Sequence, residues 1–434
     1  MLLVSTTMYK RIRLLALLVT CLIVKAQAQN LNSPYSRYGL GDIVPSQNIL
    51  TRGMGGVGAA YYDYSTVNFL NPASYSRLQA TSLDFGVELA TRSLRAVNPP
   101  RKFQAYSPQI SYVQIGIPLI KSGGWGMNIG LRPITRINYK IEQVERMNGI
   151  DSARTVYEGS GGAYEAHIGT GITLFKNLSL GVNVGYLFGS RDYSTRRYFI
   201  NDSVFYYPSN YEVKANYGGV LVNGGIQYTA KLNKKTWLRF GVHGNMQQTF
   251  NARRDYLKET FTNNSSGSTS TIDTIEYVQD ADGDVEYPSS WGAGIIFDRL
   301  GKWMIGVDYN TQQWSKYRFF KEADEVRDSY SWHIGGQIFP KGGKSYWSNV
   351  SYRAGFSLGT DYISVDRDLP RWSASVGVGL PMRKPAYSNQ FSVINTTFEF
   401  GQRGDKNSAV RENFFQLAIG LSLSDIWFIK RKYD

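Results

Sequence analysis

The sequence has 434 residues and a formal net charge of +14, with 48 Lys and Arg against 34 Asp and Glu, three His and one Cys. A single cysteine excludes a disulfide framework. No stretch beyond the N-terminal region approaches about eighteen consecutive apolar residues, which excludes helical membrane spans. Because the basic residues are scattered among aromatic-rich segments, we expect contact with outer-membrane lipid and none with nucleic acid.

Residues 1–28 are predicted to be a cleavable secretory signal. A basic stretch at 10–13 precedes an apolar run at 14–24, and alanines at 26 and 28 offer a small-residue cleavage site. The apolar run is too short to span a bilayer as a helix. Cys21 lies inside this segment, so the mature chain has no thiol nucleophile. The prediction places the protein in a Gram-negative outer membrane once the later strands are considered.

Residues 29–78 are predicted to form a hatch, or plug, seated inside the structure that the rest of the chain builds. Glycine is costly to order in regular structure, and it serves tight turns and close backbone approach. The segment from Arg52 to Arg77 is glycine-rich and ends near an Asn-Pro-Ala tripeptide. The candidate gate residues are Gly53, Gly55, Gly56, Gly58, Asn71, Pro72 and Ala73.

The spacing Gly53-x-Gly55-x-x-Gly58 matches the dinucleotide-binding fingerprint. That motif has meaning only after a strand and at the start of a helix in a βαβ unit. The preceding residues 46–52 carry no strand pattern, and no crossover helix follows. We therefore expect no nucleotide site and no cofactor.

Residues 79–434 alternate apolar and polar side chains almost throughout, which is typical of half-buried strands. Leu83 and Leu89, for example, alternate with Asp84 and Glu88. The pattern predicts fourteen strands, near 81–92, 108–120, 125–139, 162–175, 178–190, 217–231, 236–250, 287–298, 302–316, 328–339, 347–359, 371–382, 389–401 and 412–424. We therefore predict an all-β fold, a 14-stranded antiparallel transmembrane β-barrel.

The connections between these strands alternate between short turns and long loops, the longest running from 251 to 286. An even strand count with this alternation is typical of an outer-membrane barrel. The nine tryptophans are predicted to lie at strand ends, in two girdles at the membrane–water interfaces. Basic residues in the short turns are consistent with a solvated rim or with lipid headgroups.

The chain resembles the long-chain fatty acid transporter (FadL-type) outer-membrane proteins. The glycine-rich stretch with Asn71-Pro72-Ala73 is similar to the hatch of that family. Later family motifs are resembled by Pro288–Gly292, followed by Trp303, Asp308-Tyr309 and Trp314-Ser315, and by Tyr352–Gly355. The resemblance covers essentially the whole mature chain and implies fourteen strands, an apolar ligand site above the hatch, and a lateral exit where the third strand bends.

In this chain the third strand contains Gly130 and Pro133. Proline cannot donate a ladder hydrogen bond and is normally excluded from mid-strand positions. We predict that these residues mark the lateral opening, and a bulge without function is the alternative.

Candidate chemistry outside transport is weak. Asp280, Asp282 and Asp284 offer oxygen ligands for calcium, but their spacing departs from the EF-hand loop, and a solvated acidic loop tip is the alternative. The histidines are expected to point into the lumen from different strands, which does not favour a metal site. No Ser–His spacing selects a catalytic group, so we predict that the protein is not an enzyme.

We therefore predict a monomer that takes up long-chain fatty acids or other hydrophobic small molecules passively through a plugged barrel with a lateral exit. Branches of the resembled family leave an alternative: a barrel that carries exported proteins for a type IX-like secretion system. An apolar pocket behind the hatch favours transport, whereas a lumen full of salt bridges favours a secretion partner.

Overall fold

A computed structural model describes residues 32–96, 100–120, 123–148, 150–201, 204–263, 268–340, 345–365, 367–382 and 391–425. The predicted signal peptide, Trp427, and the basic residues predicted in the turns at 341–344 and 383–384 lie outside these ranges.

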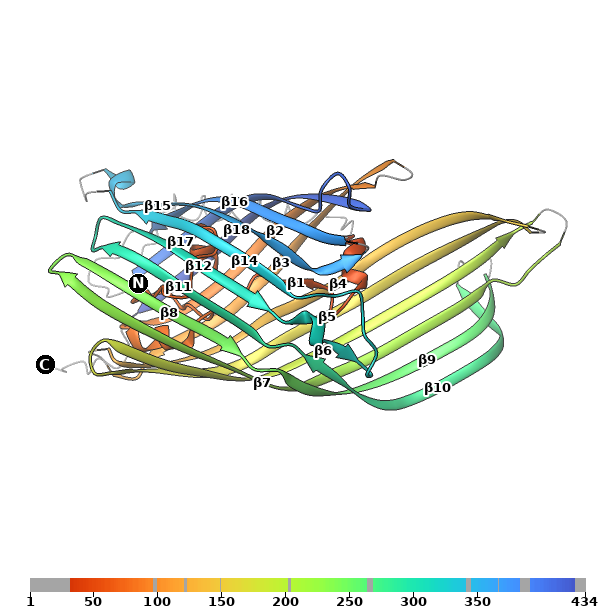
Figure 1. The fold of residues 1–434 in the computed structure, drawn as a ribbon, viewed down its shortest axis with the longest axis horizontal. Helices are drawn as coiled ribbons and strands as arrows, with labels where there is room; N and C mark the ends of the chain where they lie inside the picture. The colour runs from red at the N-terminus through yellow and green to blue at the C-terminus, as the bar shows by residue number, and fades with distance from the viewer. Residues whose placement is uncertain are drawn as a thin grey trace, which may run out of the picture.

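The described strands form one closed antiparallel barrel of fourteen strands (Figure 1), which confirms the predicted fold class. Its continuous strands are β2 (Thr81–Ala96), β3 (Arg101–Pro118), β4 (Trp125–Met147), β5 (Ile150–Leu174), β6 (Leu178–Ile200), β7 (Ser209–Asn233), β12 (Trp303–Gln312), β14 (Ser329–Ile338), β15 (Ser351–Val365), β16 (Arg367–Pro381), β17 (Phe391–Arg403) and β18 (Val410–Asp425). Two strands are interrupted: β8 (Thr236–Asn245) continues as β9 (Gln248–Asn263), and β10 (Thr269–Tyr287) continues as β11 (Ser290–Arg299). Pairing of β18 with β2 closes the wall.

The predicted alternation of side chains describes the wall well. Leu83 and Leu89 are exposed on the outside, 41% and 49% accessible, whereas Asp84 and Glu88 on the same strand are buried inside. In a barrel, alternate residues must face opposite sides of a single sheet. The outer surface is therefore apolar and the bore polar, as in barrels that span membranes.

The long loops were the wrong part of the strand prediction. The segment 251–286, predicted to be a loop, is a paired hairpin of β9 and β10. β4 with β5 and β6 with β7 likewise extend far past the predicted strand ends, and β9 and β10 run beyond the main wall in Figure 1. These extensions carry polar residues on both faces, so no period of two marks them. We refer to this end of the barrel as the long-hairpin end and to the other as the short-turn end.

Residues 32–80, the N-terminal segment, fold into short elements: η1 (Pro34–Arg37), β1 (Asp42–Ile43), α2 (Ile49–Arg52) and η2 (Pro72–Arg77). Their hydrogen-bond partners come from strands all round the wall. Asp308 of β12 accepts from Gly58, Gln227 of β7 donates to Ala59, and Thr397 of β17 donates to Ile49. A segment bonded to opposite sides of a closed wall lies in its bore.

The bore is not polar throughout, because a large apolar cluster occupies part of it toward the long-hairpin end. η3 (Trp314–Lys316) and β13 (Arg318–Phe319), in the connection after β12, contribute Trp314, Tyr317 and Phe319 to it. Trp314 is 2% exposed and stacks near Tyr362, with ring centroids 4.2 Å apart. The predicted girdle position is wrong for this tryptophan, because its strand ends at Gln312 and the chain then turns inward. The remaining short helix is η4 (Tyr346–Asn349), and within the described ranges no helix has the length and apolarity to cross a membrane.

Candidate functional site: the gap between the second and third strands

The wall is incomplete between β3 and β4. β3 spans Arg101–Pro118, but it pairs with β4 only from Pro118↔Gly126 to Val113↔Leu131. β4 continues for sixteen residues past Leu131 to Met147 and stays paired with β5 on its other side, apart from an irregularity between Pro133 and Thr135. The strands therefore separate next to Gly130 and Pro133. The role of these two residues at a lateral exit stays a prediction.

Residues 32–44 take the place of β3 along the free edge of β4. β1 pairs Asp42 with Arg136 and Ile43 with Thr135. Backbone hydrogen bonds extend this contact in both directions, from Val44 to the Ile134 carbonyl at 2.9 Å and from Ser33 to the Asn138 carbonyl at 2.9 Å. The N-terminal segment thus satisfies backbone groups that the departure of β3 would leave unpaired inside the wall.

A cavity of about 540 Å³ lies behind the gap. At the gap it is lined by apolar side chains, including Ile110, Leu131 and Tyr164, each of which is also exposed on the outer surface. The Arg136 guanidinium reaches from β4 across the gap and donates to the Ile110 carbonyl of β3 at 3.1 Å. The space is amphipathic, because its inner wall carries arginines and carboxylates. These charged residues are Asp42, Glu88, Arg92, Arg132, Arg136, Asp361, Arg371, Arg403 and Glu412.

Arg52, in α2, is fixed to three strands of the wall, β2, β17 and β18. Its Nη1 donates to Glu88 Oε2 of β2 at 2.7 Å, and its Nη2 contacts Glu399 Oε2 of β17 at 3.1 Å and Gln416 Oε1 at 2.6 Å. Glu88 also accepts from Arg136 at 2.9 Å. Burial alone would lower the pKa of Arg52, but the two adjacent carboxylates outweigh this effect and raise it. The charged Arg52 guanidinium therefore attaches the N-terminal segment to the barrel wall.

Asp42 forms a second ionic contact of this kind. Its carboxylate accepts from Arg92 of β2 at 2.6 Å and from Arg403 of β17 at 2.7 Å. Burial favours a higher pKa for Asp42, but the two guanidinium groups prevail and lower it well below its ordinary range. Sequence reasoning missed both ionic contacts, because their members are far apart in the chain. The only indication in the sequence was that Glu88 alternates with apolar residues, which predicts that its side chain points into the bore.

The candidate gate glycines lie against the wall. Gly55 and Gly56 have φ of +69° and +92°, which favour glycine. A Cβ at Gly55 would lie 2.7 Å from the backbone nitrogen of Phe356, and His333 Nδ1 donates to the Gly55 carbonyl at 2.6 Å. A Cβ at Gly53 would lie 3.3 Å from the Gly377 Cα, a less tight contact. Their close packing explains the residue type, while a gate function stays a prediction.

Asn71 and Pro72 anchor the other end of the N-terminal segment near the short turns. Asn71 caps η2 by accepting from the Ala73 N–H at 3.1 Å, and its amide donates to the Ala59 carbonyl at 2.7 Å. Pro72 occupies the first turn, where no N–H is required. Wall glycines make the close approach feasible, since a Cβ at Gly225 would meet the Asn71 side chain at 2.0 Å.

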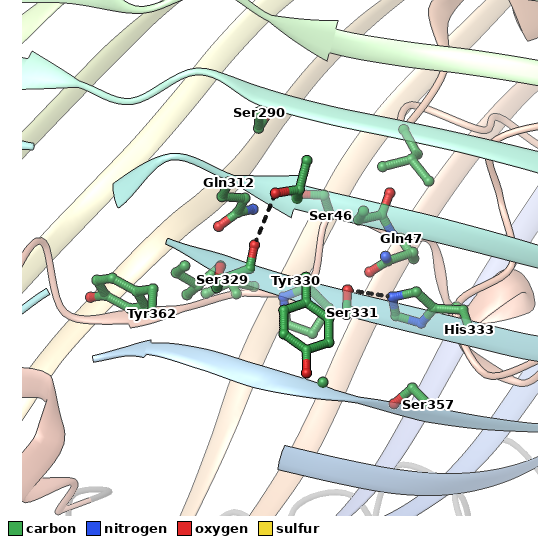
Figure 2. A pocket seen from close by; sticks show the side chains of 18 of the residues that line it. Ser46, Gln47, Ser290, Gln312, Ser329, Tyr330, Ser331, His333, Ser357 and Tyr362 are labelled. Atoms are coloured by element: carbon green, nitrogen blue, oxygen red, sulfur yellow. Dashed lines mark hydrogen bonds between the residues drawn. The ribbon is translucent and has the colours of Figure 1, made fainter. Parts of the chain in front are cut away.

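A smaller cavity of about 260 Å³ shares Ile43, Val44 and Pro45 with the first and has many polar side chains in its lining (Figure 2). Ser46 and Gln47 line it from the segment, and Ser290, Gln312, Ser331 and His333 line it from strands β11, β12 and β14. Arg371 of β16 borders both cavities and forms no ion pair within the described ranges. Its guanidinium lies 5.6 Å from the centre of the Phe414 ring.

The weak calcium candidates are on a strand, not at a loop tip. Asp280, Asp282 and Asp284 belong to β10, and Asp282 pairs with Arg253 at 3.2 Å. Across the described residues, no group of three or more His, Cys, Asp or Glu side chains has an arrangement suited to a metal. The three histidines lie on separate strands, β5, β8 and β14, as expected.

Solved structures with a similar fold include channels for hydrophobic compounds. The barrel matches the Pseudomonas putida toluene transporter TodX with a TM-score of 0.54 at 15% identity, covering 89% of this chain and 99% of that one. It matches a Pseudomonas aeruginosa FadL homologue with a TM-score of 0.56 at 11% identity, covering 89% and 100%. The Ralstonia pickettii toluene transporter TbuX gives 0.52 at 13% identity, covering 89% and 99%. At these identities the similarity establishes the fold.

No curated protein matches the sequence. The similar folds of these solved structures support the FadL-type resemblance noted in the sequence. The sequence itself matches a protein family that is described as BamG. That family's sequence pattern matches residues 8–434, almost the entire length. The chain belongs to the BamG family.

Proposed function

We propose that this protein is an outer-membrane barrel, without enzymatic activity, that passes hydrophobic small molecules passively, and that long-chain fatty acids are among them. The single observation that carries the proposal is the gap between β3 and β4 with a cavity of about 540 Å³ behind it. An opening edged by Ile110, Leu131 and Tyr164 gives an apolar molecule a route between the bore and the membrane that avoids water.

The cavity favours a ligand with an apolar body and an anionic head. Its apolar residues lie at the gap between β3 and β4, whereas Arg371, which has no ion-pair partner among the described residues, lines the cavity from β16. An amphiphile placed with its carboxylate near Arg371 satisfies both ends of the cavity. The solved structures of similar fold support transport, since two of them are toluene transporters. A carrier function in secretion, which the sequence resemblance also implied, has no support from them.

In this proposal the N-terminal segment acts as the gate. Its β1 strand borders the gap, and residues 32–44 must leave the edge of β4, or slide along it, before a ligand passes from the bore to the gap. Arg52 and Asp42 hold the segment to the wall, so the inferred opening step is the release of β1 from the edge of β4, with the Asp42 ion pairs broken and the Arg52 contacts kept. The protein acts as a monomer in this scheme.

The first test is the ligand itself. The purified protein in a neutral detergent is expected to carry apolar lipid that mass spectrometry identifies, and to bind added oleate in equilibrium dialysis. Arg371→Met is expected to weaken oleate binding about tenfold while leaving toluene binding unchanged, because only the carboxylate uses the guanidinium. Recovery of no apolar ligand, together with no binding of oleate or toluene, would reject transport.

The second test locks the gate. The pair Ile43→Cys and Thr135→Cys is placed in register across β1 and β4, and adjacent strand partners lie within the Cα range of a disulfide. The only native cysteine is Cys21, in the predicted signal. The oxidised form is expected to slow uptake of a slowly flipping labelled fatty acid into vesicles, and reduction is expected to restore it. The matched control Ala374→Cys with Phe400→Cys, on the lipid side of β16 and β17, should have no redox effect.

A further inference from the structure

The β9–β10 hairpin at the long-hairpin end presents an unpaired strand edge. β10 is bonded to β9 along one side, from Thr269 to Tyr287. On its other side it pairs only at Val285 and Glu286, with β13. From Thr271 to Gly283, among the described residues, no strand pairs with that outer edge. An exposed edge of this length is a template for adding another strand.

This edge also exposes apolar side chains. Ile272, Ile275 and Tyr277 are 48%, 68% and 57% exposed. Ile275 falls at a register shift, so it has no partner on β9 either. Bulges and charges often protect an edge from pairing, but a purely protective edge has no need of three exposed apolar groups. Their presence favours a strand partner that covers them.

The charge of the edge identifies the partner. Between Thr271 and Tyr287 the sequence has six acidic residues and no basic ones, in a chain of net charge +14. Asp282 and Glu276 pair with Arg253 and Lys258 of β9. The other acidic residues of this stretch form no ion pair within the described ranges; they are Asp273, Asp280, Asp284 and Glu286.

We propose that the outer edge of β10 binds an extended, basic polypeptide segment of a partner protein by strand addition. The backbone edge supplies the ladder, Ile272, Ile275 and Tyr277 supply apolar contact, and the unpaired carboxylates select Lys or Arg. A second copy of this chain does not fit, because pairing β10 with β10 would place acidic residues opposite one another. The proposal does not depend on transport, since this edge lies away from the gap.

The edge of β4 at the same end of the barrel provides an internal comparison. Beyond Lys140, no described residue pairs with it on its β3 side, but its charges are mixed, with Glu142 and Glu145 beside Arg146. Glu145 already pairs with Arg197 at 2.5 Å. We therefore expect the basic segment to choose β10.

The test uses short fluorescein-labelled peptides and the whole protein in a neutral detergent, with binding followed by fluorescence anisotropy. The probe is a peptide in which Lys alternates with Val. One comparison peptide replaces Lys with Glu, and another keeps every Lys but has Pro at alternate positions, so it retains the charge and cannot form a ladder. We expect the Lys–Val peptide to bind and the other two to bind at least about tenfold more weakly.

Two variants locate the site. The triple variant Asp273→Asn, Asp280→Asn and Asp284→Asn is expected to weaken binding of the Lys–Val peptide about tenfold, and Ile275→Pro is expected to abolish it. Glu142→Gln, on β4, is the matched control and should bind as the wild type does. Circular dichroism and the heat-modified mobility of the barrel on gels check that each variant is folded.

Three outcomes would overturn the proposal. If the Lys–Val peptide does not bind to the wild type, the edge is protected, and if the Pro-containing peptide binds equally well, charge attraction alone is responsible. Unchanged binding of the Lys–Val peptide to a folded Ile275→Pro variant would show that β10 is not the site. Uptake of fatty acid by these same variants is expected to be normal, so failure here is distinguishable from failure of the transport proposal.

Discussion

Arg52 of the N-terminal segment and Glu88 of β2 form a buried ion pair, with Nη1 and Oε2 2.7 Å apart and side chains 4% and 2% exposed. Glu88 is also the partner of Arg136, whose guanidinium bridges the gap to β3. One carboxylate therefore connects the position of the N-terminal segment to the edge of the opening. Any displacement of the segment changes the charge balance at the gap.

Replacing Arg52 tests the strength of this connection. Arg52→Met is expected to destabilise the protein by about 3 kcal/mol, because it leaves Glu399 without its buried partner and Glu88 with Arg136 alone. The measurement is the free energy of unfolding in urea. The matched control is Arg253→Met, which removes an ion pair whose members are 70% and 83% exposed. An exposed pair contributes on the order of 0.5 kcal/mol. Equal losses for the two variants would contradict the assignment.

Acidification is expected to weaken the seating of β1. The pKa of Asp42 is lowered in the folded protein by Arg92 and Arg403 despite burial, so its contribution is complete above the unfolded value, about 3.9. That contribution is lost as pH falls below this value toward the folded pKa. Asp42→Asn should therefore lower Tm at pH 7, and the difference from wild type should shrink at about pH 3. A difference that stays constant between the two pH values would exclude this linkage.

Comparing Gly55→Ala with Gly301→Ala distinguishes the energetic cost of backbone strain from the cost of close packing. Gly55 and Gly301 have nearly the same φ, +69° and +66°, but only Gly55 has wall atoms where a Cβ would lie. Gly301→Ala should cost about 1 kcal/mol from conformation alone. Gly55→Ala should cost at least about 1–2 kcal/mol more, because a Cβ there cannot fit without moving Phe356 or the segment. Unfolding in urea measures both, and similar losses would show that the contact is easily relieved.

Trp314 is expected to behave as a core residue. Trp314→Ala removes a buried ring from the apolar cluster and should cost about 3–5 kcal/mol. Trp347→Ala removes a side chain that is 63% exposed, in η4, and is expected to cost less than about 1 kcal/mol. Thermal unfolding monitored by circular dichroism compares them. A small effect at Trp314 would indicate that the cluster repacks.

The barrel could be predicted from the sequence because residues such as Leu83 and Asp84 must face opposite sides of one wall. Gly130 and Pro133 marked the place where β3 leaves β4, since proline cannot complete a ladder. The β9–β10 hairpin could not be predicted by periodicity, because polar residues occur on both its faces and register shifts interrupt the alternation along β10. The pairing of β1 with β4 involves only the two residues Asp42 and Ile43 of β1, and it depends on tertiary position, which local sequence does not encode.

The route of residues 32–80 has a consequence for assembly. The segment begins beside Lys140, passes down the bore, and leads into β2, the strand that meets β18 to close the ring. Once β2 and β18 have paired, the wall surrounds the bore, and residues 32–80 can enter or leave it only along its axis. Residues 32–80 are therefore either enclosed when β18 joins β2 or threaded lengthwise into the finished cylinder, and in both cases the first-made part of the chain depends on the last-made part for its walls.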